Sequence, residues 1–208
     1  MWIGGPMPEI VKHCIKTHKL EGYEHIWIDN GTIIDLEFKT DYLTECFNAR
    51  NYGKASDYLR VCYLEKYGGI YLDADTEVLK PFDDVLDNEM FVCEEDNGFV
   101  ANGIIGAVPN HPMLTHYKGV IERNFRGGGE LVFQPGMYLF TELVKYSRWT
   151  PGIKVYAPDW FLPYNHQTDK LNITENTHTN HYYLKSWLNH HGDQKADYPE
   201  KGVELGGL

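Results

Sequence analysis

Asp73 and Asp75 stand one residue apart at the end of a short apolar run. Residues 70–73 are apolar and β-prone, which predicts a buried strand that ends at the two aspartates. Side chains two positions apart on an extended or turning segment can point toward one ion. Magnesium and manganese prefer carboxylate oxygens and leave coordination positions open for phosphate oxygens. The pair therefore predicts a divalent-metal site that suits a phosphate-bearing substrate.

A helix should precede this strand. Residues 54–67 are mostly good helix formers, with Ser56 expected as the N-cap and two glycines at the end, where a positive φ is usually needed. Asp57 and Arg60 are three residues apart and therefore share a face of this helix. The sequence predicts a polar helix face aimed at the aspartates.

Each of these features also has a simpler interpretation. An Asp-x-Asp pair commonly caps a turn or faces solvent, and two glycines after a helix often mark only a turn. An aspartate and an arginine three residues apart on a helix are often a surface ion pair of little energetic value. Their occurrence together, in this order, is much more specific than any one of them.

In this order, residues 55–84 resemble the sugar-binding region with an Asp-x-Asp motif of glycosyltransferase family 32. The same pattern is similar to the glucosyltransferase domain of the large clostridial toxins. Residues 2–6, Trp-Ile-Gly-Gly-Pro, resemble the segment that follows the first strand in those proteins. Residues 181–188, His-Tyr-Tyr-Leu-Lys-Ser-Trp-Leu, resemble their closing segment. The three landmarks cover nearly the whole chain.

The resemblance implies roles residue by residue. Trp2 would flank the nucleotide base, and Asp57 and Arg60 would bind hydroxyls of the donor sugar. Asp75 would ligate the metal, and His181 would be a distant second ligand, at a place where the family has paired histidines and this chain has His-Tyr. The implied donor-binding residues are Trp2, Ile3, Gly4, Asp57, Arg60, Tyr71, Asp73, Asn102, Ser186 and Trp187; the implied metal ligands are Asp75, His181 and Asp73; the implied catalytic set is Asp73, Asp75, Asp57 and Arg60.

The rest of the chain alternates predicted helices with predicted strands. Helices are expected over residues 8–19, 41–49, 112–124 and 136–146, strands over 24–28, 91–94, 103–108 and 154–157, and a loop over 158–166. Such alternation is typical of an α/β protein. Together with the resemblance it predicts a GT-A type nucleotide-diphospho-sugar transferase fold, with a mainly parallel central sheet flanked by helices.

Composition sets further bounds. The 208 residues suffice for one domain, which we place at residues 1–190, with a mobile tail over 191–208. The net charge of −11 argues against a nucleic-acid partner, whose binding rests on many lysine and arginine contacts. No apolar run is long enough for a transmembrane segment, and the four cysteines have no metal or redox spacing. We expect a cytoplasmic protein that is a monomer or weak oligomer.

The sequence and the resemblance together predict a metal-dependent, retaining glycosyltransferase. It would move a hexose from a nucleotide-diphosphate sugar, with a UDP-sugar favoured and Mn²⁺ or Mg²⁺ as cofactor, to an unknown carbohydrate-type acceptor such as a capsule, lipopolysaccharide or other glycan. One alternative is a magnesium phosphatase of the haloacid dehalogenase type, because residues 72–76 also resemble its Asp-x-Asp-x-Thr loop. That family, however, places the loop close to the N-terminus. Another alternative is a catalytically inactive sugar-binding module.

Overall fold

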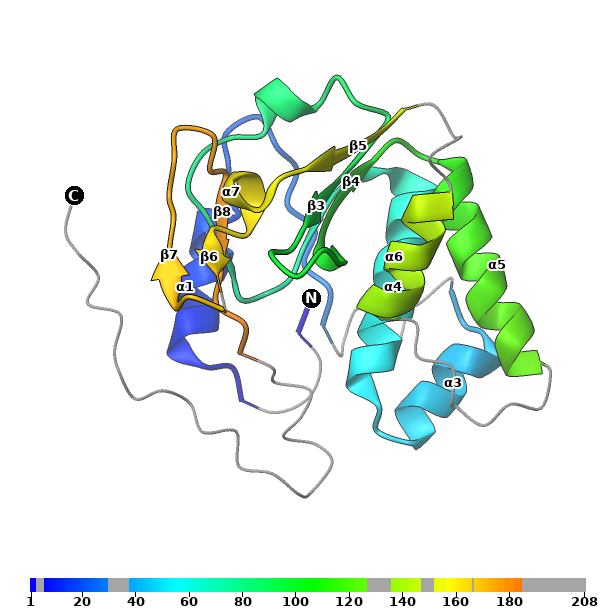
Figure 1. Ribbon diagram of the computed structural model, residues 1–208. Coiled ribbons are helices and arrows are strands. Elements are labelled where there is room, and N and C mark those ends of the chain that lie inside the picture. Colours follow the sequence, from blue (N-terminus) through cyan, green and yellow to red (C-terminus); the bar gives the residue numbers. More distant parts are fainter. Residues whose placement is uncertain (3–5, 30–37, 127–135, 147–151, 166, 185–208) are drawn as a thin grey trace.

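The computed structural model describes residues 1–2, 6–29, 38–126, 136–146, 152–165 and 167–184 (Figure 1). Its helices are α1 (Glu9–Thr17), α3 (Asp41–Asn48), α4 (Tyr52–Tyr67), the 3-10 helix η1 (Asp83–Val85), α5 (Pro112–Arg126), α6 (Met137–Tyr146) and α7 (Pro158–Phe161). Its strands are β1 (Gly69–Leu72), β2 (Thr76–Val78), β3 (Met90–Glu94), β4 (Val100–Ala107), β5 (Ile153–Tyr156), β6 (Tyr164–Asn165), β7 (Lys170–Leu171) and β8 (Thr179–His181).

The central sheet has the strand order β1-β4-β3-β5. β1 pairs antiparallel with β4, β4 pairs antiparallel with β3, and β3 pairs parallel with β5. The expectation of a mainly parallel sheet is therefore wrong for the described strands. The reason is local, because the short turn over residues 95–99 joins β3 to β4, and strands joined by a tight turn run antiparallel. The dipeptide Asn97-Gly98 within this turn is a strong hairpin signal.

Successive residues of the central strands enter two different cores, one on each face of the sheet. From β3, Met90 and Val92 pack in a core with residues of α4, α5 and α6, whereas Phe91 and Cys93 pack in a second core with Phe161 of α7. This alternation follows from the two-residue period of a strand. Figure 1 shows α4, α5 and α6 together on one side of the sheet and α1, α7 and β8 on the other. Because both faces of the sheet are covered, we expect a functional site at the ends of the strands.

α4 is the expected helix, but it begins earlier than predicted. Asn51 is its N-cap, since the side-chain oxygen accepts a hydrogen bond from the amide of Lys54 at 3.2 Å. The expectation that Ser56 caps the helix is wrong: its hydroxyl lies one turn further on and donates to the carbonyl of Gly53 at 2.8 Å. Asn is at least as good an N-cap as Ser. The helix therefore begins after the first of these residues along the chain, Asn51.

The other expected elements are confirmed within a few residues, with two exceptions. Residues 24–28 form no strand in the structure, although the amide of Trp2 donates to the carbonyl of Ile28 at 3.0 Å. Residues 158–166, expected as a loop, contain α7 and the short strand β6. Within the described ranges, no helix has the length and apolar character needed to cross a membrane.

Candidate functional site

The Asp-x-Asp motif occupies the turn between β1 and β2. The amide of Asp73 donates to the carbonyl of Gly103 on β4 at 2.8 Å, and the amide of Thr76 donates to the carbonyl of Asp73 at 3.1 Å. A Cβ atom at position 103 would lie 2.7 Å from Oδ2 of Asp73. Gly103 therefore lets the strand backbone approach the carboxylate closely, which is a common reason for glycine in a strand.

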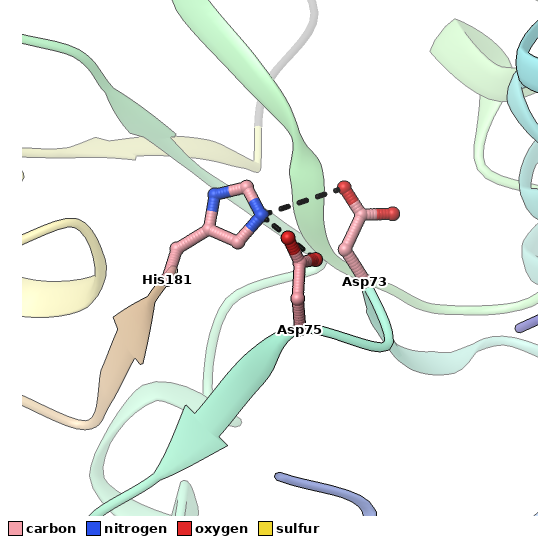
Figure 2. Close-up of side chains that lie close together, drawn as sticks. All are labelled: Asp73, Asp75 and His181. Atoms are coloured by element: carbon pink, nitrogen blue, oxygen red, sulfur yellow. Dashed lines mark hydrogen bonds and ion pairs between the residues drawn. The ribbon is translucent and has the colours of Figure 1, made fainter. Parts of the chain in front are cut away.

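The strand β8 brings a histidine to this turn. β2 and β8 pair antiparallel, with Thr76 opposite His181. Nε2 of His181 lies 3.1 Å from Oδ1 of Asp75 and 4.0 Å from Oδ2 of Asp73, as Figure 2 shows. One ligand atom from each of the three residues lies within 4.8 Å of the other two. Residues separated by 106 positions in the chain thus form one cluster of possible metal ligands.

Asp75 is held from several directions. The amide of Leu184 donates to its Oδ2 at 2.8 Å, and the amide of Tyr182 donates to its backbone carbonyl at 3.0 Å. Burial by itself would raise the pKa of Asp75, but the charge and hydrogen bond of His181 and the Leu184 amide outweigh it and lower the pKa to about 2. The carboxylate is therefore ionised at neutral pH, as a metal ligand must be.

Burial alone would also lower the pKa of His181. The charge and hydrogen bond of Asp75, then the charges of Asp73 and, more remotely, Glu95, outweigh burial and raise it. Two carboxylates and one imidazole form a mixed oxygen and nitrogen set that suits Mn²⁺, and carboxylates alone suit Mg²⁺. A cation at this place would displace the imidazole proton that now faces Asp75. By this chemistry the three residues fit a divalent metal ion.

A second polar network lies beside the cluster, on α4 and β4. Nη2 of Arg60 lies 3.0 Å from Oδ1 of Asp57 and 3.5 Å from Oδ1 of Asp73. Nη1 of Arg60 donates to the carbonyl of Asn102 at 2.5 Å, and Nδ2 of Asn102 donates to Oδ1 of Asp57 at 3.0 Å. β4 bulges away from β3 over residues 102–104, and such bulges often re-aim side chains next to active sites. The network joins the helix face and the metal-ligand cluster into one site.

Arg60 is 4% exposed, so it acts from beneath the site rather than at its surface. Its guanidinium also packs over the ring of Tyr71, with 4.6 Å between Cζ and the ring centroid. Burial raises the pKa of Tyr71, so its hydroxyl stays protonated and donates to Oδ1 of Asp73 at 2.7 Å. Burial likewise raises the pKa of Asp57 to about 6, although the charge of Arg60 opposes the shift. The carboxylates of Asp57 and Asp73 are half-buried, so both are accessible to a ligand.

The structure brings together most of the residues that the sequence singled out. Asp57, Arg60, Tyr71, Asp73, Asp75, Asn102 and His181 form the continuous set described above. Trp2 is half-buried and is tied to the chain through its bond to Ile28. Ile3, Gly4, Ser186 and Trp187 lie outside the described residues, as does the expected tail.

Two functional features escaped the sequence reasoning. Gly103 creates the space for Asp73, and only its place directly after Asn102 could have drawn attention to it. The strand β8, which carries His181, is three residues long and has no apolar alternation to indicate a strand. Its partner β2 is equally short, so the pairing that completes the site leaves almost no local signal.

The fold belongs to the GT-A type, which is found in glycosyltransferases. Residues 7–92 match the family described as “Glycosyltransferase sugar-binding region containing DXD motif”. The matched residues contain Asp73 and Asp75, which form an Asp-x-Asp pair of the kind that this description names. The resemblance expected from the sequence is confirmed.

Two curated relatives match most of this chain. An uncharacterized glycosyltransferase of Acanthamoeba polyphaga mimivirus is 27% identical over 76% of this chain and 66% of its own. The mannosyl phosphorylinositol ceramide synthase CSH1 of Saccharomyces cerevisiae is 24% identical over 85% of this chain and 50% of its own. The chain thus spans less than two thirds of the length of these relatives. A solved structure, that of the PaToxG glycosyltransferase, matches with a TM-score of 0.57 at 22% identity, over 73% of this chain and 67% of that one, which shows the shared fold.

Proposed function

We propose that this protein transfers a hexose from a nucleotide-diphosphate sugar, with a UDP-sugar favoured, to a carbohydrate-type acceptor. The observation that carries the proposal is the convergence of Asp73, Asp75 and His181 beside the network of Asp57 and Arg60. The first set suits a metal-bound diphosphate, and the second presents carboxylates to a sugar. The family match and the fold favour this function over the phosphatase alternative, which neither of them supports.

Asp73, Asp75 and His181 would hold Mn²⁺ or Mg²⁺. When bound, such a cation stabilises the negative charge that develops on a departing diphosphate. Because Asp75 is fixed by the Leu184 amide and His181 by the β2–β8 pairing, the ligands need little reorganisation to receive it. Preorganised charge of this kind is commonly the largest contribution to catalysis.

Asp57 would accept hydrogen bonds from hydroxyls of the donor sugar, with Asn102 beside it. Arg60 would hold the Asp57 and Asp73 carboxylates in place from beneath, since it contacts both. In the transfer, the bond between the anomeric carbon and the diphosphate oxygen breaks and a bond from the acceptor hydroxyl oxygen forms. The hydroxyl proton passes to the departing diphosphate. Approach of the acceptor on the face that the diphosphate leaves gives retention.

A panel of nucleotide sugars with manganese, read out as released nucleoside diphosphate, tests the proposal directly. We expect one UDP-sugar to be cleaved, and Asp75→Asn to reduce its cleavage by about 100-fold or more, because a ligand of a catalytic metal is lost. Asp87→Asn, at an exposed carboxylate, is the matched control and should leave the rate unchanged. Cleavage that persists in Asp75→Asn, or in wild-type protein with excess chelator, would contradict metal dependence. Absence of cleavage with every donor would contradict the function.

A further inference from the structure

The strand that carries His181 belongs to a very small sheet. Among the described strands, β2 and β8 form a sheet of their own, in which each strand has three residues. A two-stranded ribbon is at best marginally stable by itself in water. Contacts from other parts of the chain must therefore hold β8, and with it His181, beside Asp75.

The helix α1 supplies such contacts along β2. Oγ1 of Thr17 accepts a hydrogen bond from the amide of Val78 at 2.8 Å, and Nε2 of His18 lies 2.6 Å from the carbonyl oxygen of Thr76. Unpaired backbone groups are the weakness of an edge strand. The side chains of α1 thus bond to backbone groups of β2 as a further strand would, which fixes the ribbon to the body of the protein.

Glu77, in the middle of β2, extends this support to the residue that follows His181. Nε2 of His13 on α1 lies 2.8 Å from Oε1 of Glu77, and the hydroxyl of Tyr182 donates to Oε2 of Glu77 at 2.7 Å. The Glu77 side chain is 18% exposed and that of His13 is 40% exposed. Because ion pairs open to solvent contribute little, the bond from Tyr182 is the one expected to matter. Glu77 therefore bridges α1 and the segment after β8.

That segment wraps around Asp75. The amide of Tyr182 donates to the backbone carbonyl of Asp75, and the amide of Leu184 donates to its Oδ2. Between these two bonds Tyr183 has a φ of 51°, in the left-handed region that residues other than glycine rarely adopt. Such a backbone conformation persists only where the surrounding structure holds it. The bond from Tyr182 to Glu77 lies directly beside the strained residue and is placed to hold it.

We propose that Glu77 is a positioning residue of the metal site. Through the hydroxyl of Tyr182 it holds residues 181–184 around Asp75, and it thereby sets His181 and Asp75 in the arrangement that receives the cation. This inference rests on the proposed function, which supplies the cation. Partners that orient metal ligands without touching the metal commonly change metal affinity by about 10-fold to 100-fold when they are replaced.

The affinity of the full chain for Mn²⁺, measured from the electron paramagnetic resonance of the free ion, tests this role without any transfer reaction. Tyr182→Phe removes only the hydroxyl and changes no charge. Glu77→Ala removes the bridge, whereas Glu77→Gln removes the charge but keeps an oxygen that accepts from Tyr182. Tyr58→Phe is the matched control, because the Tyr58 hydroxyl also donates to a glutamate, Glu122, at 2.7 Å, but between α4 and α5. Urea denaturation without metal reports the stability of each variant.

We expect the dissociation constant for Mn²⁺ to rise by about ten-fold or more in Tyr182→Phe and in Glu77→Ala. Glu77→Gln should stay close to the wild type, and so should Tyr58→Phe, even where that control loses stability. Wild-type affinity in Tyr182→Phe would overturn the proposal. So would a Glu77→Gln protein as weak as Glu77→Ala, because the charge of Glu77 and not its hydrogen bond would then act on the cation.

Donor cleavage, measured separately on the wild type, keeps this role and the proposed function apart. If Mn²⁺ affinity follows the expected order but no nucleotide sugar is cleaved, the transferase function is refuted and the role of Glu77 stands. If the wild type cleaves a donor only with metal, yet Tyr182→Phe and Glu77→Ala bind Mn²⁺ as well as the wild type, the role of Glu77 is refuted and the function stands. A wild type that binds no Mn²⁺ would refute the role of Glu77 together with metal dependence.

Discussion

Gly103 lies so close to Asp73 that a Cβ atom at position 103 would stand 2.7 Å from the Oδ2 oxygen of Asp73. The position of a proposed metal ligand thus depends on the absence of a side chain on the neighbouring strand. The same glycine accepts a hydrogen bond from the Asp73 amide, so the backbone and the carboxylate of Asp73 are set by one residue.

Gly103→Ala should therefore disable the site more than the fold. The added methyl group must push the carboxylate of Asp73 aside, and misplacement of a reacting group by about 1 Å can cost about 100-fold in rate. The stability cost of such overpacking is about 1–3 kcal/mol. Donor cleavage and urea denaturation measure the two effects. Gly119→Ala, where the added Cβ would meet the flexible end of Arg123, is the control and should retain full activity. Unchanged activity in Gly103→Ala would contradict this role of Gly103.

Asp57→Asn should weaken binding of the sugar-bearing donor far more than binding of the bare nucleoside diphosphate. The carboxylate faces the proposed sugar position, and loss of a hydrogen bond to a charged group costs about 1–3 kcal/mol. Isothermal titration with the nucleotide sugar and with the nucleoside diphosphate, both in manganese, gives the two affinities. If both affinities fell equally, Asp57 would be a structural residue that holds Arg60.

Arg60→Lys should reduce both stability and donor cleavage, although the charge is kept. The guanidinium reaches Asp57, Asp73 and the carbonyl of Asn102 at once, and a single ammonium cannot satisfy these partners in the same geometry. Leaving buried partners unpaired costs about 1–3 kcal/mol for each group. Arg123→Lys, at an exposed arginine on α5, supplies the comparison. Equal stability of the two variants would show that charge alone suffices at position 60.

His178 should make the fold sensitive to acid. Its ring is buried between Phe82 and Trp160, its Nδ1 contacts the carbonyl of Pro81 at 2.7 Å, and burial lowers its pKa despite the opposing charge of Asp84. The charge of Lys80 acts in the same direction as burial, whereas backbone hydrogen bonds of Pro81 and Lys80 oppose it. A lowered pKa in the folded state means that the unfolded chain binds the proton first. Stability present above pH 6.5 is therefore lost as the pH falls below it.

Denaturation at several pH values tests this expectation. His178→Gln removes the titration but keeps a hydrogen-bonding group, so the loss of stability between neutral pH and pH 5 should become smaller. For one proton the effect is at most about 1.4 kcal/mol per pH unit. His116→Gln, at an exposed histidine on α5, should leave the profile unchanged. Identical profiles for wild type and His178→Gln would show that His178 contributes nothing to the acid sensitivity.

Local sequence predicted the parts of the site that lie close together in the chain. β1 was visible as an apolar run, and the i, i+3 spacing of Asp57 and Arg60 placed both side chains on one face of α4. His181 could be placed only through the family resemblance, because no local pattern relates β8 to a turn more than 100 residues earlier.

The antiparallel sheet was missed for a different reason. The alternation of helices and strands indicates an α/β protein but not the direction of each strand. The turn signal of Asn97-Gly98 indicates a hairpin of β3 and β4, but it carries no information on the antiparallel pairing of β4 with β1. The bulge at residues 102–104 and the clearance at Gly103 depend on register between strands, which side-chain periodicity does not encode.

The pairing of β2 with β8 has a consequence for how the site comes into being. As the chain leaves the ribosome, Asp73 and Asp75 emerge long before His181, and the partner strand of β2 is among the last described segments to be made. A nascent or truncated chain that ends before position 179 would contain the whole of residues 7–92 and both aspartates, yet it would lack the imidazole. The ability to bind the cation should therefore appear only after position 181 has been made, so that a shorter chain would not consume the donor.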